Sequence, residues 1–133
     1  HATIRRQRQM CIRDSDSRVL AMAQAILEAT GFSAIPTTSG EEAVEVYRRS
    51  YSNNVPISLV LLDYALPGGM NGVETLDALK AVDNNVQVIA TSGYFDESSA
   101  GAARQRGFVG ILPKPYTAER LSKVVEWGVN KAA

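Results

Sequence analysis

Three polar features of this 133-residue chain stand just after runs of apolar residues. Asp63 follows the run at residues 57–62, Thr91 and Ser92 follow residues 86–90, and Lys114 closely follows residues 109–112. A carboxylate, a hydroxyl and an ammonium group suit phosphoryl transfer, because they can supply a nucleophile, a partner for a phosphoryl oxygen and a counter-charge. Taken alone, each is better explained by a structural role, as a strand-end acid, a turn or a surface lysine, so the hypothesis depends on their convergence.

The apolar runs are typical of buried strands, and segments with helical periodicity separate them. Strands are expected at residues 32–37, 57–62, 86–90 and 109–112. Helices are expected from residue 17 to a stop at Gly31, from a capping box at residues 39–42, after the loop at 64–72, over residues 96–106, and after Thr117. This alternation predicts an α/β fold with a doubly wound parallel sheet, whose strand ends bring the three polar features to one edge.

The composition argues against several classes of partner. The chain has 14 basic and 14 acidic residues, so its formal net charge is zero and gives no reason to expect a nucleic-acid partner. Its single cysteine, Cys11, excludes an internal disulfide and fits a reducing compartment. No apolar run approaches the roughly 18 residues of a membrane span. We therefore expect a cytoplasmic domain without membrane contact.

Three motifs together resemble one known family. The segment LVLLDYALPGGMNG around Asp63, the segment VIATSGY around Ser92 and the segment ILPKPY around Lys114 resemble the corresponding motifs of response-regulator receiver domains. The motifs occur in the same order and with similar spacing, and the resemblance runs from about residue 14 to about residue 129. The combination is most similar to receivers of hybrid sensor histidine kinases.

The resemblance implies a fold and a set of roles. The fold would be flavodoxin-like, with five parallel strands in the order 2-1-3-4-5. Asp63 would accept a phosphoryl group from a histidine kinase or a phosphotransfer domain, and the domain would then switch conformation. Ser92, rather than Thr91, would be the switch hydroxyl, and Lys114 would contact the phosphoryl group, with a cis Lys114–Pro115 bond.

The resemblance also implies a Mg²⁺ cofactor. Its ligands would be the carboxylates of Asp14 and Asp63 and the backbone carbonyl of Ala65. Receivers normally carry two adjacent acids at the end of the first strand, but here the second position is Ser15. A second departure is Ile111, three residues before the lysine, where the family usually has a tyrosine or phenylalanine.

Two other classes use the same fold. One is a phosphate-independent interaction module, which would be expected to lose Asp63 or Lys114. The other is a haloacid-dehalogenase-type phosphatase, which needs a general acid two residues after its aspartate, where this chain has Ala65. Receivers catalyse their own phosphorylation and dephosphorylation, so the chain is not expected to be a dedicated enzyme. It would be a fragment of a hybrid kinase or a stand-alone regulator.

The segment in the place of the first strand is unlike the rest of the chain. Residues 5–15, RRQRQMCIRDS, contain four arginines and only three consecutive apolar residues. One back-translation of this segment reproduces a transposon-type sequencing-library adapter through the first two bases of the Ser15 codon. Our hypothesis is that residues 1–15 are a non-native, adapter-derived segment and that residues 16–133 are the receiver domain, with its first strand degraded, missing or replaced.

Overall fold

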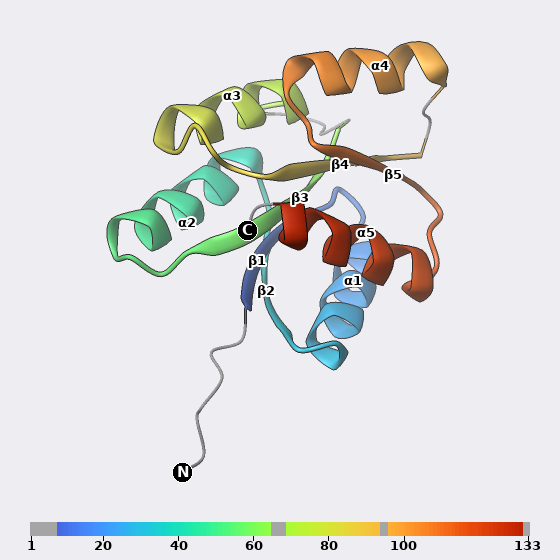
Figure 1. The fold of residues 1–133 in the computed structure, drawn as a ribbon, viewed down its shortest axis with the longest axis horizontal. Helices are drawn as coiled ribbons and strands as arrows, with labels where there is room; N and C mark the ends of the chain where they lie inside the picture. Colours follow the sequence, from blue (N-terminus) through green and yellow to red (C-terminus); the bar gives the residue numbers. More distant parts are fainter. Residues whose placement is uncertain (1–7, 65–68, 94–95, 132–133) are drawn as a thin grey trace.

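A computed structural model describes residues 8–64, 69–93 and 96–131 of the chain. Strands and helices alternate throughout (Figure 1). The strands are β1 (Arg8–Arg13), β2 (Phe32–Thr37), β3 (Ile57–Asp63), β4 (Val88–Ser92) and β5 (Gly110–Pro113). The helices are α1 (Ser17–Ala29), α2 (Gly40–Ser52), α3 (Gly72–Val82), α4 (Glu97–Arg106) and α5 (Ala118–Lys131).

The strands form one parallel sheet in the order β2-β1-β3-β4-β5. This confirms the predicted doubly wound α/β fold and its strand order. Helices α1 and α5 cover one face of the sheet, and α2, α3 and α4 cover the other (Figure 1). The carboxyl ends of all five strands therefore lie along one edge.

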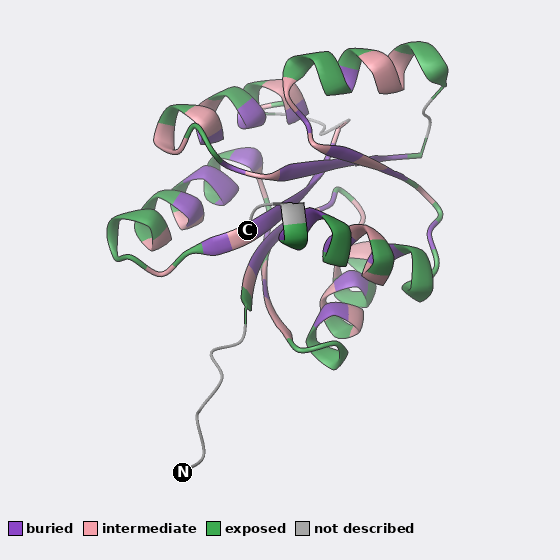
Figure 2. Cartoon of the chain, viewed as in Figure 1, coloured by how far each residue is buried: buried purple, intermediate pink, exposed green. Residues whose placement is uncertain are grey.

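Two apolar cores hold these layers together, one on each face of the sheet (Figure 2). Strand β3 contributes to both, because side chains alternate between the faces of a strand. Leu59 and Leu61 pack with α1 and α5, whereas Val60 and Leu62 pack with α2, α3 and α4. A strand buried on both faces explains the continuous apolar run before Asp63.

Part of the arginine-rich segment at residues 5–15 forms β1, which lies between β2 and β3 in the sheet. Met10, Cys11 and Ile12 are each at most 1% exposed, whereas the polar Arg8 and Gln9 lie at the start of the strand, where they reach solvent. Three consecutive apolar residues therefore carry the burial that this strand provides. The strand is poorly suited at Arg13, whose Nε is buried without a hydrogen-bond partner.

The boundaries of three strands differ by one or two residues from the sequence-based prediction: β3 ends at Asp63 rather than at residue 62, β5 covers Gly110–Pro113 rather than residues 109–112, and β4 is shifted as a whole. Strand β4 begins at Val88 rather than at residue 86, because Val86 donates its N–H to the Asp83 carbonyl in a turn. At its other end β4 extends to Ser92, which pairs with Pro113 of β5 rather than lying in the following loop. Helix α4 ends as predicted, with Gly107 in the left-handed region at φ 116°.

The length and polarity of the described helices bear on whether they could span a membrane. Within residues 8–64, 69–93 and 96–131, none has both the length and the apolar character needed to cross a bilayer.

Candidate active site

The carboxyl edge of the sheet brings together residues that are far apart in the sequence. Asp63 ends β3 and pairs in register with Thr91 of β4, and the N–H of the next residue, Tyr64, donates to the Thr91 carbonyl at 2.7 Å. Lys114 follows β5, and its N–H donates to the Ser92 carbonyl at 2.7 Å. The end of β4 thus fixes the main chain of both partners.

The Lys114 ammonium group lies between two carboxylates. Its Nζ is 2.9 Å from Asp14 Oδ2 and 3.1 Å from Asp63 Oδ2. The two aspartate side chains are only 7% and 3% exposed, and the lysine side chain is 17% exposed. The structure therefore brings together three of the predicted site residues: Asp14, Asp63 and Lys114.

Ser15 also belongs to this cluster. Its Oγ donates to Asp63 Oδ2 at 2.8 Å, and its backbone N–H donates to the same oxygen at 3.2 Å. Together with the Lys114 ammonium group, this places three donors on one carboxylate oxygen. The sequence had identified Ser15 only as the position of a missing acid, because nothing in its type or spacing indicated a contact with Asp63.

The start of α1 positions Asp14. Asp16 is the N-cap of this helix, and its Oδ1 accepts from the Arg18 N–H at 2.9 Å. The N–H of the same Asp16 donates to Asp14 Oδ1 at 2.8 Å. The turn that begins the helix therefore also orients the carboxylate that Lys114 contacts.

The two hydroxyl residues at the end of β4 lie on opposite faces of the sheet. Thr91 has the same parity along β4 as Ile89, which packs with α1 and α5, and Ser92 has the parity of Ala90, which packs with α2, α3 and α4. Thr91 is 1% exposed and Ser92 is 7% exposed. Ile111, beside Ala90 on β5, packs on the same side as Ala90.

Two further predicted features, the Lys114–Pro115 bond and Ala65, belong to the edge of the site. The Lys114–Pro115 bond is cis, as the resemblance implied. Ala65, the proposed carbonyl ligand, lies outside the described residues.

The charges of the cluster act on its neighbours. Burial alone would lower the pKa of Lys114, but hydrogen bonds and attraction from Asp14 and Asp63 outweigh this effect and raise that pKa above its ordinary value of 10.5. Burial, together with the negative charge of the same aspartates, raises the pKa of Tyr116 to about 12. The lysine is therefore fully charged at neutral pH, as a counter-charge for phosphoryl oxygens must be.

The donor set fits Mg²⁺, but with one acid fewer than the family pattern. Mg²⁺ commonly takes one or two carboxylates and fills its other positions with water and phosphate oxygens. Asp14, Asp63 and the Ser15 hydroxyl offer such hard oxygen donors at one point of the sheet edge. Over the described ranges, no group of three His, Cys, Asp or Glu side chains forms a potential metal site.

Substituting Lys114 with methionine should lower the free energy of unfolding by about 2–3 kcal/mol. Removing one partner of a buried ion pair costs about 3–5 kcal/mol, and this lysine keeps some solvent contact. The urea midpoint at constant slope measures the change. A matched control is Lys123→Met, because Lys123 pairs with Glu119 at 3.1 Å on the exposed surface of α5. That variant should change stability by less than about 1 kcal/mol, and equal losses in both variants would contradict the argument.

The stability difference between the parent and Lys114→Met should depend on pH, and the raised pKa of Lys114 fixes the sign of this dependence. Because the pKa of Lys114 is raised in the folded state, its stabilisation is complete below the unfolded pKa of about 10.4. It is then lost as the pH rises through the folded pKa. The stability difference between the parent and Lys114→Met should therefore be constant near neutrality and decrease above about pH 10.

The chain is similar to several curated regulatory proteins over most of its length. It is 30% identical to the nitrogen assimilation regulatory protein NtrX of Azorhizobium caulinodans over 85% of its own length and 24% of that protein's. It is 22% identical to sporulation initiation phosphotransferase F of Bacillus subtilis over 89% of this chain and 90% of that protein. The chain spans 24–46% of the length of the first curated relatives that it matches.

Solved structures agree with these relatives. A response regulator receiver domain protein from Clostridium thermocellum superposes with a TM-score of 0.81 and 25% identity, covering 93% of this chain and 95% of that one. Residues 10–126 match the family described as the response regulator receiver domain. This match includes four of the five strands in full and all the residues of the lysine–aspartate cluster. The chain therefore belongs to the response regulator receiver domain family of two-component systems.

Proposed function

We propose that Asp63 is the phosphoacceptor of this receiver domain. The observation that carries the proposal is the Lys114 ammonium group 3.1 Å from a carboxylate oxygen that is buried at a strand end. A buried carboxylate beside a fixed positive charge is a nucleophile with a built-in partner for the charge of a phosphoryl group.

The transfer step needs few groups from this chain. A carboxylate oxygen of Asp63 attacks the phosphorus atom of a phosphohistidine or an acyl phosphate, forming an O–P bond as the bond to the leaving group breaks. The leaving nitrogen or oxygen keeps the bonding electrons, and the imidazole or carboxylate so formed equilibrates its proton with solvent. Lys114 faces the added negative charge on the phosphoryl oxygens.

The remaining predicted residues support this step. Ser92, at the end of β4, is proposed as the hydroxyl that donates to a phosphoryl oxygen after transfer. Asp14, Asp63 and the Ala65 carbonyl are proposed as ligands of Mg²⁺. Such an ion would supply positive charge that offsets the charge of the carboxylates and of the phosphoryl group.

The phosphoryl donor is proposed to be a histidine kinase or a phosphotransfer domain in the cytoplasm. One matched relative is the autoinducer 1 sensor kinase/phosphatase LuxN of Vibrio campbellii, of which the chain spans 12%. Another, sporulation initiation phosphotransferase F, is matched over most of its length. Both a domain of a larger kinase and a separate regulator are therefore compatible with this receiver.

Labelling by acetyl phosphate tests the proposal. In the presence of Mg²⁺, the chain should gain the mass of one phosphoryl group, located on the peptide that contains Asp63. Neutral hydroxylamine should remove the label, because it cleaves acyl phosphates but not serine phosphates. A hydroxylamine-resistant label on Ser15 or Ser92 would overturn the proposal. So would the absence of label in both the parent and Ser15→Asp, the variant that restores the second acid of the family pattern.

A further inference from the structure

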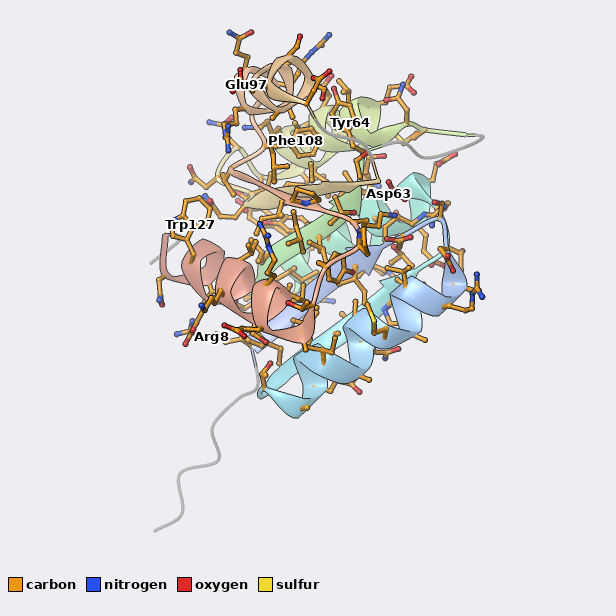
Figure 3. All side chains as sticks on the ribbon, turned by 90° about the vertical axis from the view of Figure 1, so that its right-hand side faces the viewer. Arg8, Asp63, Tyr64, Glu97, Phe108 and Trp127 are labelled. Carbon is orange, nitrogen blue, oxygen red and sulfur yellow. The ribbon has the colours of Figure 1, made fainter. Side chains whose placement is uncertain are left out.

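An aromatic contact leads from the residue after the phosphoacceptor to the end of helix α4, on one face of the sheet. Tyr64 directly follows Asp63, and its ring meets the ring of Phe108 edge to face, with centroids 5.6 Å apart and planes at 61°. Figure 3 shows both side chains on the α4 side of the sheet. The backbone N–H of Tyr64 donates to the Thr91 carbonyl at 2.7 Å, so the ring projects from the end of the sheet, next to the backbone of Asp63.

Phe108 lies at the end of α4. Its N–H donates to the Ala103 carbonyl at 3.2 Å, one residue after Gly107 closes the helix in the left-handed conformation. Phe108 is 3% exposed and belongs to the same core cluster as Ala103. A displacement of this ring therefore acts on the last turn of α4.

Helix α4 has few other attachments. Ala103 is its single buried residue within the described part of the chain, whereas α2 and α3 each bury four. Gly101, in the interior of α4, has no atom within 4 Å of the position that a Cβ would take, so packing does not require a glycine there. An interior glycine weakens a helix, and α4 therefore depends strongly on the contact at its C-terminal end.

Ile111 does not provide an equivalent link. It is half-buried against the same cluster, beside Ala90, but it has no ring, so a conformational switch cannot use an aromatic side chain at this position. The Tyr64–Phe108 pair instead joins the residue after Asp63 directly to the end of α4.

We propose that the Tyr64–Phe108 contact transmits phosphorylation of Asp63 to helix α4. This inference rests on the proposed function of Asp63. Phosphorylation joins one carboxylate oxygen of Asp63 to a phosphoryl group, whose negatively charged oxygens compete for Lys114 and Ser15, the donors now on Asp63 Oδ2. The adjustment of the Asp63–Tyr64 backbone shifts the Tyr64 ring, and the ring moves the end of α4 through Phe108.

The test compares α4 before and after labelling in matched variants. The full chain and its Ser15→Asp version are labelled with acetyl phosphate and Mg²⁺, and amide hydrogen exchange is measured over residues 97–106. Tyr64→Leu and Phe108→Leu remove the ring contact, whereas Tyr64→Phe keeps it. Tyr51→Leu is the control, because it removes a ring from another aromatic pair, Tyr47–Tyr51 of α2, with centroids 6.5 Å apart.

We expect the α4 response to labelling to be lost in Tyr64→Leu and Phe108→Leu, although Asp63 is still labelled. It should persist in Tyr64→Phe and Tyr51→Leu, and the double leucine variant should be no more affected than either single variant. A parental α4 response in the labelled leucine variants would overturn the link and leave the phosphoacceptor assignment intact. If Asp63 is labelled in none of these proteins, the parent and Ser15→Asp included, the proposed function is overturned, and the link with it.

Discussion

Replacing Asp63 with asparagine should reduce labelling by acetyl phosphate at least about 100-fold, to the level of background. The amide has no anionic oxygen to attack phosphorus, so the nucleophile itself is removed rather than weakened. The fold should survive, because an asparagine oxygen can still accept from Ser15 and Lys114, and one of two adjacent like charges is lost. Intact-protein mass measures the label, and urea unfolding measures stability.

The matched control is Asp83→Asn. Asp83 accepts from the Tyr47 hydroxyl at 2.7 Å and follows α3, away from the carboxyl edge of the sheet. This variant removes a hydrogen-bonded carboxylate without touching the site, and its labelling should equal that of the parent. Undiminished labelling of Asp63→Asn would show that another residue accepts the phosphoryl group.

The second large effect is expected from Ser15→Asp, which should raise Mg²⁺ affinity by about tenfold or more. Asp14, Asp63 and Lys114 together carry a formal charge of −1, and the new carboxylate makes it −2. A unit charge about 4 Å from another contributes up to about 4 kcal/mol near a protein surface, and a tenfold gain needs only about 1.4 kcal/mol. Calorimetric titration with Mg²⁺ measures the affinity without any labelling.

The effect of Ser15→Asp on stability should change sign with the metal. Without Mg²⁺, the variant loses the hydrogen bond from Ser15 to Asp63 and gains repulsion, so it should unfold about 1–2 kcal/mol more easily. With saturating Mg²⁺, it should be at least as stable as the parent. Ser17→Asp adds the same charge at an exposed position of α1 and should not change Mg²⁺ affinity by more than about twofold. Equal affinities of Ser15→Asp and the parent would show that the metal lies elsewhere.

The position of Ser15 connects this prediction with the origin of the first strand. We propose that residues 1–15 are adapter-derived and that a native strand ending in two acids preceded Asp16. Supporting this, the segment leaves a buried Arg13 atom without a hydrogen bond and places serine where the family has an acid. Sequencing of the source locus decides the matter, since an uninterrupted reading frame encoding RRQRQMCIRDS would refute the proposal.

The fold was predictable because its signals are local. Continuous apolar runs, capping residues such as Ser39 and Asp96, and Gly107 each act within a few residues, and the alternation of elements then restricts the topology. The convergence of Asp63 and Lys114 followed from the same logic, since strands that run in parallel end at one edge. Strand β1 was harder to predict, because three apolar residues among arginines and glutamines are only a weak strand signal. Their burial between β2 and β3 is what makes this segment a strand.

The contacts that the sequence did not indicate depend on register and side-chain direction. Ser15 reaches Asp63 across 48 positions through a turn at the start of α1, and no periodicity announces such a contact. The Tyr64–Phe108 pair joins the residue after β3 to a residue before β5, and neither residue type nor their spacing in the sequence indicates the contact. Contacts of this type require the positions of backbones that the hydrophobic pattern does not specify.

The end of β4 has a consequence for how this domain can vary in evolution and in engineering. Two consecutive carbonyls, of Thr91 and Ser92, hold the main chain at the start of both the segment after β3 and the segment after β5. The distance between acceptor and lysine is therefore set upstream of those loops. Insertions or deletions farther along them can alter partner recognition while the reacting groups keep their spacing, which makes these loops suitable places for sequence grafts.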